Sequence, residues 1–161
     1  MNSAKQLVIF VVQDQHYALP LSSVERIVRA VEITELPTPS KDTLGVINIE
    51  GRIVPVLNSR KIFGKPEREM ELRDLFVIVT ESNKSVALVA DQVKPVMVVP
   101  DEKIVPSEEF NSNGYVKGIT GDKNGMIIVL ATEQVLAVQK SPVPLIAASV
   151  TASLTQEMHH G

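Results

Sequence analysis

Apolar residues in this chain come in short runs separated by polar turn residues, and they rarely recur at the three- and four-residue spacing of an amphipathic helix. Val is the most frequent apolar residue. β-Branched residues favour strands because their side chains pack well on a pleated surface. The pattern therefore predicts an all-β fold with about nine or ten short strands.

Two hairpins are predicted in the first half of the chain. Residues 7–12 and 16–19 flank a tight turn, and Pro20 ends the returning strand because proline cannot donate to a ladder. The second hairpin covers residues 44–57, where Gly51 can adopt the positive φ that a short turn requires.

The second half of the chain shows the same pattern of strands and turns. Hairpins are predicted over residues 75–90 and 115–130, each around a polar turn. A further strand over residues 93–99 contains Pro95, which cannot donate a backbone hydrogen bond. We expect this strand to lie at a sheet edge or to carry a bulge.

Capping signals predict three short helical segments. Ser22 and Glu25 have the spacing of a capping box, which predicts a helix that reaches about Ile27 and is followed by a strand. A single capped turn is expected over residues 58–64, and a short helix over residues 132–138.

The charged segment 65–74 divides the chain into two strand-rich halves. We interpret it as a solvated connector and expect two small packed barrels within one domain at residues 5–139. Residues 140–161 form a tail of different composition, which either frays or forms an amphipathic helix. The apolar residues of that helix would be Ile146, Val150, Leu154 and Met158.

The amino-acid composition excludes or disfavours several classes of function. The 161 residues include no Cys, which excludes disulfides, thiolate metal ligands and a cysteine nucleophile and fits a reducing compartment. Aromatic residues make up only 4% and the net charge is −3, which disfavours a nucleic-acid partner. The chain shows neither a signal-peptide pattern nor a membrane-spanning run, so we expect a soluble cytoplasmic protein without membrane insertion.

Few residues are candidates for catalysis or metal binding. His16 lacks an obvious nucleophile partner, and the adjacent His159 and His160 lack further metal ligands. The glycine-containing segment 118–125 lies between two strands and reads as a hairpin turn, not as a phosphate loop. Three aspartates are expected to stabilise turns through nearby backbone amides: Asp14, Asp91 and Asp122. The residues alone therefore predict a binding or adaptor module, not an enzyme, and no metal or cofactor.

The most specific motif of the chain surrounds the turn at residues 50–51. It consists of Gly-Val-Ile-Asn at residues 45–48, Gly51, and Val-Pro-Val at residues 54–56. Further blocks precede and follow it at residues 7–10, 17–21, 24–27, 63–64, 86–91 and 118–130. In their order and spacing these blocks resemble the CheW family of bacterial chemotaxis coupling proteins.

This resemblance implies an all-β fold with short helices, built as two packed five-stranded SH3-like β-barrels, without catalysis or cofactor. Family members bind the cytoplasmic hairpin tip of methyl-accepting chemotaxis receptors and the regulatory domain of the histidine kinase CheA. The resemblance therefore implies a cytoplasmic adaptor that is recruited to membrane-associated receptor arrays, with an architecture that allows self-association.

By position, the resemblance assigns partner contacts to several residues. They are Val24 on the predicted short helix, Arg26, Gly45, Glu50 and Gly51, and Val93 and Val96 on the strand 93–99. The valines could instead belong to the core. The two glycines could serve backbone geometry alone, which Gly51 in particular would do in its turn.

Two departures from the family pattern stand out. Family members usually carry Glu two residues after position 24 and Arg just before position 51, whereas this chain has Arg26 and Glu50. We hypothesise that these residues pair with exchanged polarity and that the chain serves a dedicated signalling array. The alternative is two unrelated surface charges. The second departure is Asn58-Ser59-Arg60 where the family often has Asp-Leu-Arg, which leaves open whether the usual binding surfaces are fully kept.

Other functions remain open at this point. A CheW-like scaffold could serve a specialised pathway that controls pili, gliding or gene expression. A stand-alone β-barrel that binds a peptide or small ligand would instead require a closed pocket with converging polar groups. An enzyme would require a second titrating group in a cleft around His16.

Overall fold

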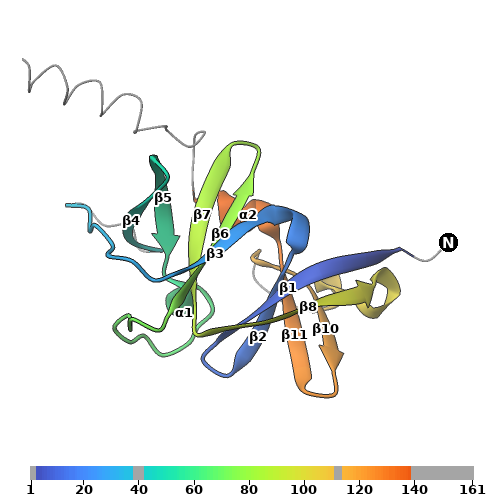
Figure 1. Cartoon of the computed structure of the whole chain (residues 1–161). Coiled ribbons are helices and arrows are strands. Elements are labelled where there is room, and N and C mark those ends of the chain that lie inside the picture. Colours follow the sequence, from blue (N-terminus) through green and yellow to red (C-terminus); the bar gives the residue numbers. More distant parts are fainter. Residues whose placement is uncertain (1–2, 38–41, 111–113, 139–161) are drawn as a thin grey trace, which may run out of the picture.

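The computed structural model describes residues 3–37, 42–110 and 114–138, and it arranges them as two β-sheets that pack against each other (Figure 1). The six-stranded sheet has the order β8-β1-β2-β11-β10-β9 and the five-stranded sheet the order β3-β6-β7-β5-β4. The six strands are β1 (Ala4–Val12), β2 (Gln15–Pro20), β8 (Gln92–Pro100), β9 (Val105–Pro106), β10 (Val116–Asp122) and β11 (Gly125–Leu130). The five strands are β3 (Val24–Arg29), β4 (Thr43–Ile49), β5 (Arg52–Leu57), β6 (Leu75–Glu81) and β7 (Lys84–Ala90).

The predicted fold class, all-β with short helices in two packed β subdomains, is confirmed. The described strands number six and five, so the strand count differs from the expected five and five. Neither described ladder closes on itself, and each sheet therefore has two edge strands.

The division of the chain into a first and a second half is wrong. The N-terminal strands β1 and β2 belong to the same sheet as β8 to β11, whereas β3 to β7 form the other sheet. Parallel pairs between distant strands, β2 with β11 and β5 with β7, complete the two sheets. The segment 65–74 lies between α1 (Ser59–Ile62) and β6, so it does not connect the two sheets.

A shared hydrophobic core joins the sheets. It contains Phe10 and Tyr17 from the six-stranded sheet and Val77 and Leu88 from the five-stranded sheet, all of them buried. The Tyr17 ring stacks on Phe10 at a centroid distance of 5.8 Å. It also stacks on Phe63 of the segment after α1 at 4.1 Å. Burial raises the pKa of the Tyr17 phenol to about 12, so the ring is neutral at physiological pH.

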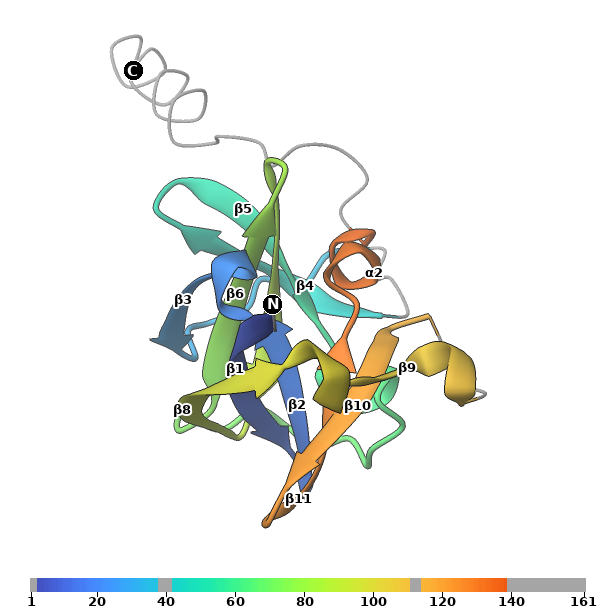
Figure 2. The same cartoon turned by 90° about the vertical axis from the view of Figure 1, so that its right-hand side faces the viewer.

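The helix α2 (Thr132–Leu136) also links the sheets. It directly follows β11 in the chain (Figure 2). It packs Val135 and Leu136 into the shared core, against β6 and β7. This helix and α1 confirm two of the three predicted helical segments. In α1 the Asn58 side chain caps the helix by accepting a hydrogen bond from the Lys61 amide at 3.2 Å.

The prediction of a third helix, from Ser22 to about Ile27, is wrong. A single 3₁₀ turn, η1 (Leu21–Ser23), leads directly into the strand β3. The Glu25 carboxylate of the predicted capping box bonds to Arg52 and Thr80 instead of capping a helix, and the neighbouring Ser23 hydroxyl donates to Glu81 at 3.2 Å. Tertiary partners therefore override the local capping pattern.

The remaining elements follow the predictions closely. All four hairpins form, and the segment 118–125 lies within the β10–β11 hairpin. The strand β8 lies at a sheet edge, and its register against β1 shifts close to Pro95, so both expected consequences of this proline occur. Two further 3₁₀ turns, η2 (Asp101–Lys103) and η3 (Ser107–Glu109), flank β9.

The predicted tail helix and the pair His159–His160 lie outside the described residues. The domain boundary at residue 139 therefore stays a prediction. Within the described segments, every helix is too short to cross a bilayer.

Candidate partner-binding surfaces

Arg26 on β3 and Glu50 in the β4–β5 turn form an ion pair with two hydrogen bonds. The two terminal guanidinium nitrogens of Arg26 donate to the two carboxylate oxygens of Glu50 at 2.8 and 3.1 Å. These hydrogen bonds, together with the positive charge, hold the pKa of Glu50 below its usual value. The pairing predicted from the exchanged charges is therefore confirmed.

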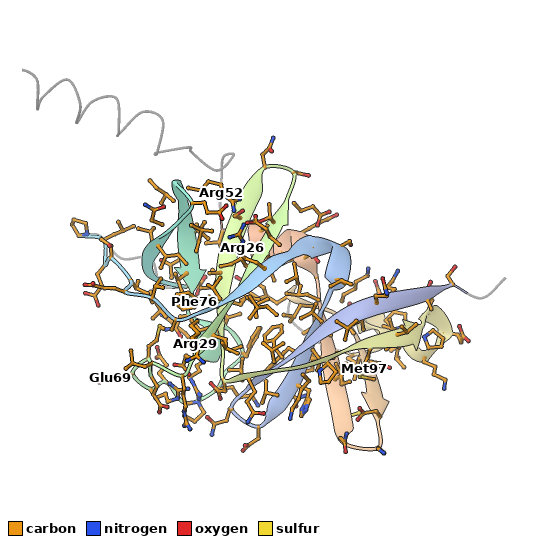
Figure 3. The ribbon with its side chains drawn as sticks, in the orientation of Figure 1. Arg26, Arg29, Arg52, Glu69, Phe76 and Met97 are labelled. Atoms are coloured by element: carbon orange, nitrogen blue, oxygen red, sulfur yellow. The ribbon has the colours of Figure 1, made fainter. Side chains whose placement is uncertain are left out.

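The pair belongs to a longer row of alternating charges. The Arg26 Nε lies 3.3 Å from Glu25, and Glu25 also pairs with Arg52 of β5. Thr80 donates to Glu25 at 2.8 Å, and Arg52 donates to Ser85 at 3.1 Å. Burial alone would raise the pKa of Glu25, but the hydrogen bonds from Arg52 and Thr80 outweigh it and lower the pKa. Figure 3 shows Arg26 and Arg52 side by side on this part of the five-stranded sheet.

A β-bulge explains how two consecutive residues join the same row. Val24 pairs with Val79 and Arg26 with Ile78, so Glu25 is an extra residue on β3. Consecutive side chains of a regular strand point to opposite faces, whereas a bulge re-aims them. The bulge thus lets Glu25 reach β5 and β6 while Arg26 reaches the hairpin turn.

The hairpin turn is built by its two central residues. Glu50 has φ +50° and Gly51 φ +84°, as in the two-residue turns that match the twist of a hairpin. The Gly51 amide donates to the Asn48 side chain at 2.8 Å, which closes the turn. The backbone alone accounts for Gly51, while Glu50 also contributes its side chain to the charge row.

Gly45 allows β4 to approach the segment after β3. Thr34 and Val46 exchange two backbone hydrogen bonds of 2.9 Å. A Cβ at position 45 would lie 2.3 Å from the Thr34 carbonyl oxygen, and the Gly45 φ of +148° disfavours other residues. This glycine thus has a structural role whether or not a partner touches it.

The three predicted valines differ in exposure. Val24 begins β3, instead of lying on a helix as predicted, and like Val93 it is half-buried against the shared core. Val96 is 46% exposed on the edge strand β8, and Val98, which the sequence analysis overlooked, is 64% exposed. Residues two apart in a strand share a face, so Val98 could have been found from Val96 by alternation. The charge row lies on the five-stranded sheet, as does Val24, whereas Val93, Val96 and Val98 lie on the edge strand β8 of the six-stranded sheet.

Sequence analysis also missed an ion cluster around Asp91. Arg60 donates to both Asp91 oxygens at 2.8 Å, Arg68 donates to Asp91 at 2.9 Å, and the Gln13 amide donates at 2.8 Å. Arg68 further donates to both oxygens of Asp74, whose side chain is fully buried. Arg68 and Asp74 thus tie the segment 65–74 to Asp91, while its Leu72 and Arg73 stay exposed, as in the predicted solvated connector.

Comparisons with known proteins identify the family and the fold of the chain. Residues 6–140 match the family model of the CheW-like domain. The chain belongs to this family. Among curated relatives it is 24% identical to the chemotaxis protein CheW of Rhizobium meliloti, over 83% of this chain and 88% of that protein. It is 26% identical to the probable chemotaxis protein CheW of Rhizobium etli, over 85% of this chain and 90% of that protein.

A solved structure supports the fold as well. The scaffolding protein TtCheW from Thermoanaerobacter tengcongensis superimposes with a TM-score of 0.73 and is 27% identical, over 80% of this chain and 90% of that one. The chain is thus a CheW-like scaffold of the chemotaxis type. In this CheW-like chain the bridge between β3 and the hairpin turn has its cation on β3 and its carboxylate in the turn.

The remaining candidate groups for chemistry in this CheW-like chain are dispersed. His16 lies in β2, where Gln15 donates to its carbonyl oxygen at 3.0 Å. Within residues 3–37, 42–110 and 114–138, no three potential ligand side chains gather as a metal site would require.

Proposed function

We propose that this chain is a non-catalytic adaptor that couples methyl-accepting chemotaxis receptors to a CheA-type histidine kinase. The observation that carries the proposal is the charge row of Arg26 and Glu50 on one sheet, together with the exposed valines on the edge strand of the other, in a member of the CheW-like family. One binding partner is the cytoplasmic hairpin tip of the receptor, and the other is the regulatory domain of the kinase. The adaptor needs no cofactor.

A coupling protein must hold two partners in a fixed relation. The shared core and the Asp91 cluster join the two sheets, so surfaces on the two sheets keep their relative position. Pre-ordered surfaces lose little entropy on binding, which favours specific association through small interfaces. The chain acts in the cytoplasm and is recruited to membrane-associated arrays through its partners, where copies can also associate with each other.

The exchanged polarity favours a second, narrower function. Charge complementarity across an interface selects partners, and like charges that face each other exclude the wrong ones. A partner that reads the row around Glu50 would therefore differ from the usual one. On this basis the chain serves a dedicated array, such as one that controls pili, gliding or gene expression.

The test is a titration of the full ¹⁵N-labelled chain, followed by NMR, with a receptor hairpin tip and separately with a CheA regulatory domain from the same cell. We expect both to bind and to shift signals near Val24, Glu50 or Val93. Val96→Ser should weaken binding of one partner, whereas Met126→Ser, at an exposed apolar position in the β10–β11 hairpin, is the matched control. Binding of neither partner would refute the coupling role, and binding of the kinase alone would point to a different receptor class.

A further inference from the structure

A cleft of about 660 Å³ opens at the five-stranded sheet, between the segment that follows β3 and the segment 65–74. Its apolar wall is formed by side chains from both segments and from the sheet: Val31, Ile33, Leu44, Met70, Leu72 and Val89. In Figure 3, Glu69, which lines the cleft, lies well apart from Arg26 and Arg52. The cleft is therefore distinct from the surfaces proposed above.

Two large apolar side chains stand exposed at the cleft. Leu72 is 91% exposed, more than any other large apolar residue that the structure describes, and Val31 is 49% exposed. Isolated exposed apolar residues are common on protein surfaces, but here they border a concave apolar wall. Such an arrangement offers an anchor for apolar side chains of a partner.

Leu72 is held in place by a closed turn. The Asp74 amide donates to the Glu71 carbonyl at 3.0 Å, and the Glu71 amide donates back to the Asp74 carboxylate at 2.8 Å. Arg68 fixes Asp74 with two hydrogen bonds of 2.8 and 2.9 Å. The exposed position of Leu72 thus results from a well-bonded backbone, and binding would cost little ordering entropy.

The residues that line the cleft carry a net negative charge. Its lining includes six carboxylates and only two guanidiniums, those of Arg60 and Arg68. Both guanidiniums are already bonded to Asp91, and Arg68 also to Asp74. By contrast, the side chains of Glu32, Glu35 and Glu69 form no hydrogen bond or ion pair with other residues that the structure describes.

We propose that this cleft is a docking site for a basic amphipathic segment of a partner protein. Apolar side chains of the segment would pack on Leu72 and Val31, and its Lys or Arg residues would face the glutamates at the rim. The tail of this chain fits less well, because residues 139–161 carry a single Lys and a single Glu besides two His. A second copy fits less well too, since the chain has a net charge of −3.

The test uses two synthetic 18-residue helices with the same Leu stripe, one with Lys and the other with Glu on the polar face. They are titrated into the full ¹⁵N-labelled chain and followed by NMR. We expect only the Lys helix to bind and the Glu helix not to bind. Binding should shift the NMR signals of Val31 and Leu72, and the affinity should fall as the salt concentration rises. Leu72→Ser should weaken binding about fivefold, and Glu32→Lys combined with Glu69→Lys about tenfold.

Matched variants outside the cleft serve as controls. Val98→Ser removes an exposed valine on β8, and Glu102→Lys reverses a charge on η2; each should change the affinity less than about twofold. The proposal is overturned if neither helix binds, if both bind equally, or if the cleft variants act no more strongly than these controls. It is also overturned if Leu154→Ser shifts the signals of Val31 and Leu72, because the tail would then occupy the cleft.

Discussion

Arg60 of α1 places one guanidinium nitrogen 2.8 Å from each carboxylate oxygen of Asp91, at the turn where the chain passes from β7 to β8. These two strands belong to different sheets. Asp91 also accepts the amide of Gln13 in the β1–β2 turn, and its own amide donates to the Val11 carbonyl at 2.8 Å. One carboxylate therefore joins elements of both sheets.

We expect Asp91→Asn to destabilise the protein by about 2–3 kcal/mol, because it removes the negative partner of the largely buried Arg60 guanidinium and leaves Arg68 with Asp74 and the more distant Glu71. Urea denaturation at pH 7 measures this loss. The control Asp122→Asn, in the exposed β10–β11 turn, should cost less than about 1 kcal/mol. Equal losses for the two variants would mean that the Asp91 cluster contributes nothing specific.

The exchanged charges of Arg26 and Glu50 lead to a second prediction. Arg26→Glu and Glu50→Arg each place like charges side by side, so each should weaken binding of the receptor hairpin tip. The double exchange restores the pairing but reverses the polarity that selects the partner, so the binding should stay weak. Because both side chains are exposed, the effect should shrink at high salt. Isothermal titration with the hairpin tip measures these affinities. A double exchange that regains the parent affinity would show that the partner reads the pairing, not the polarity of the row.

Acid should destabilise the fold through Asp74. Burial would raise the pKa of this carboxyl, but hydrogen bonds from Arg68 and the Glu71 amide outweigh burial and hold the pKa below its usual value. A group with a lowered folded-state pKa stabilises the protein above its unfolded-state pKa of about 4, and this contribution is lost as the pH falls through the folded-state value.

We therefore expect the urea midpoint to fall as the pH is lowered below about 4, and Asp74→Asn to show a shallower fall. The variant should be less stable at pH 7 and should approach the parent protein at the most acidic pH, where Asp74 is protonated. Parallel pH curves for the two proteins would rule out Asp74 as the source of the acid sensitivity.

The sequence allowed the strands and hairpins to be predicted because their signals are local. Alternating apolar runs and the turn glycine Gly51 determine where the chain extends and where it reverses. The pairing of the strands could not be predicted in this way, since β2 with β11 and β5 with β7 join segments that are far apart in the chain.

The site could be predicted only in part, for the same reason. The Arg26–Glu50 pair followed from a family pattern, whereas Asp91 looked like any turn aspartate because its partners Arg60, Arg68 and Gln13 are distant in sequence. The capping box of Ser22 and Glu25 failed because Arg52 and Thr80 lie close enough in the fold to bond the Glu25 carboxylate. Side chains with several possible partners choose among them only once the chain has folded.

Gly45 allows a structural role to be separated from a binding role. Gly45→Ala would place a Cβ 2.3 Å from the Thr34 oxygen and 2.7 Å from the Ile33 Cγ2, and we expect it to destabilise the fold by about 2–4 kcal/mol. Gly114→Ala is the matched control, because the nearest atom would lie at 3.7 Å and the stability should change by less than about 1 kcal/mol. Unfolding curves and partner affinity are measured on both variants. If Gly45→Ala kept the parent stability but lost affinity for the receptor tip or the kinase domain, the glycine would serve the interface and the steric explanation would be wrong.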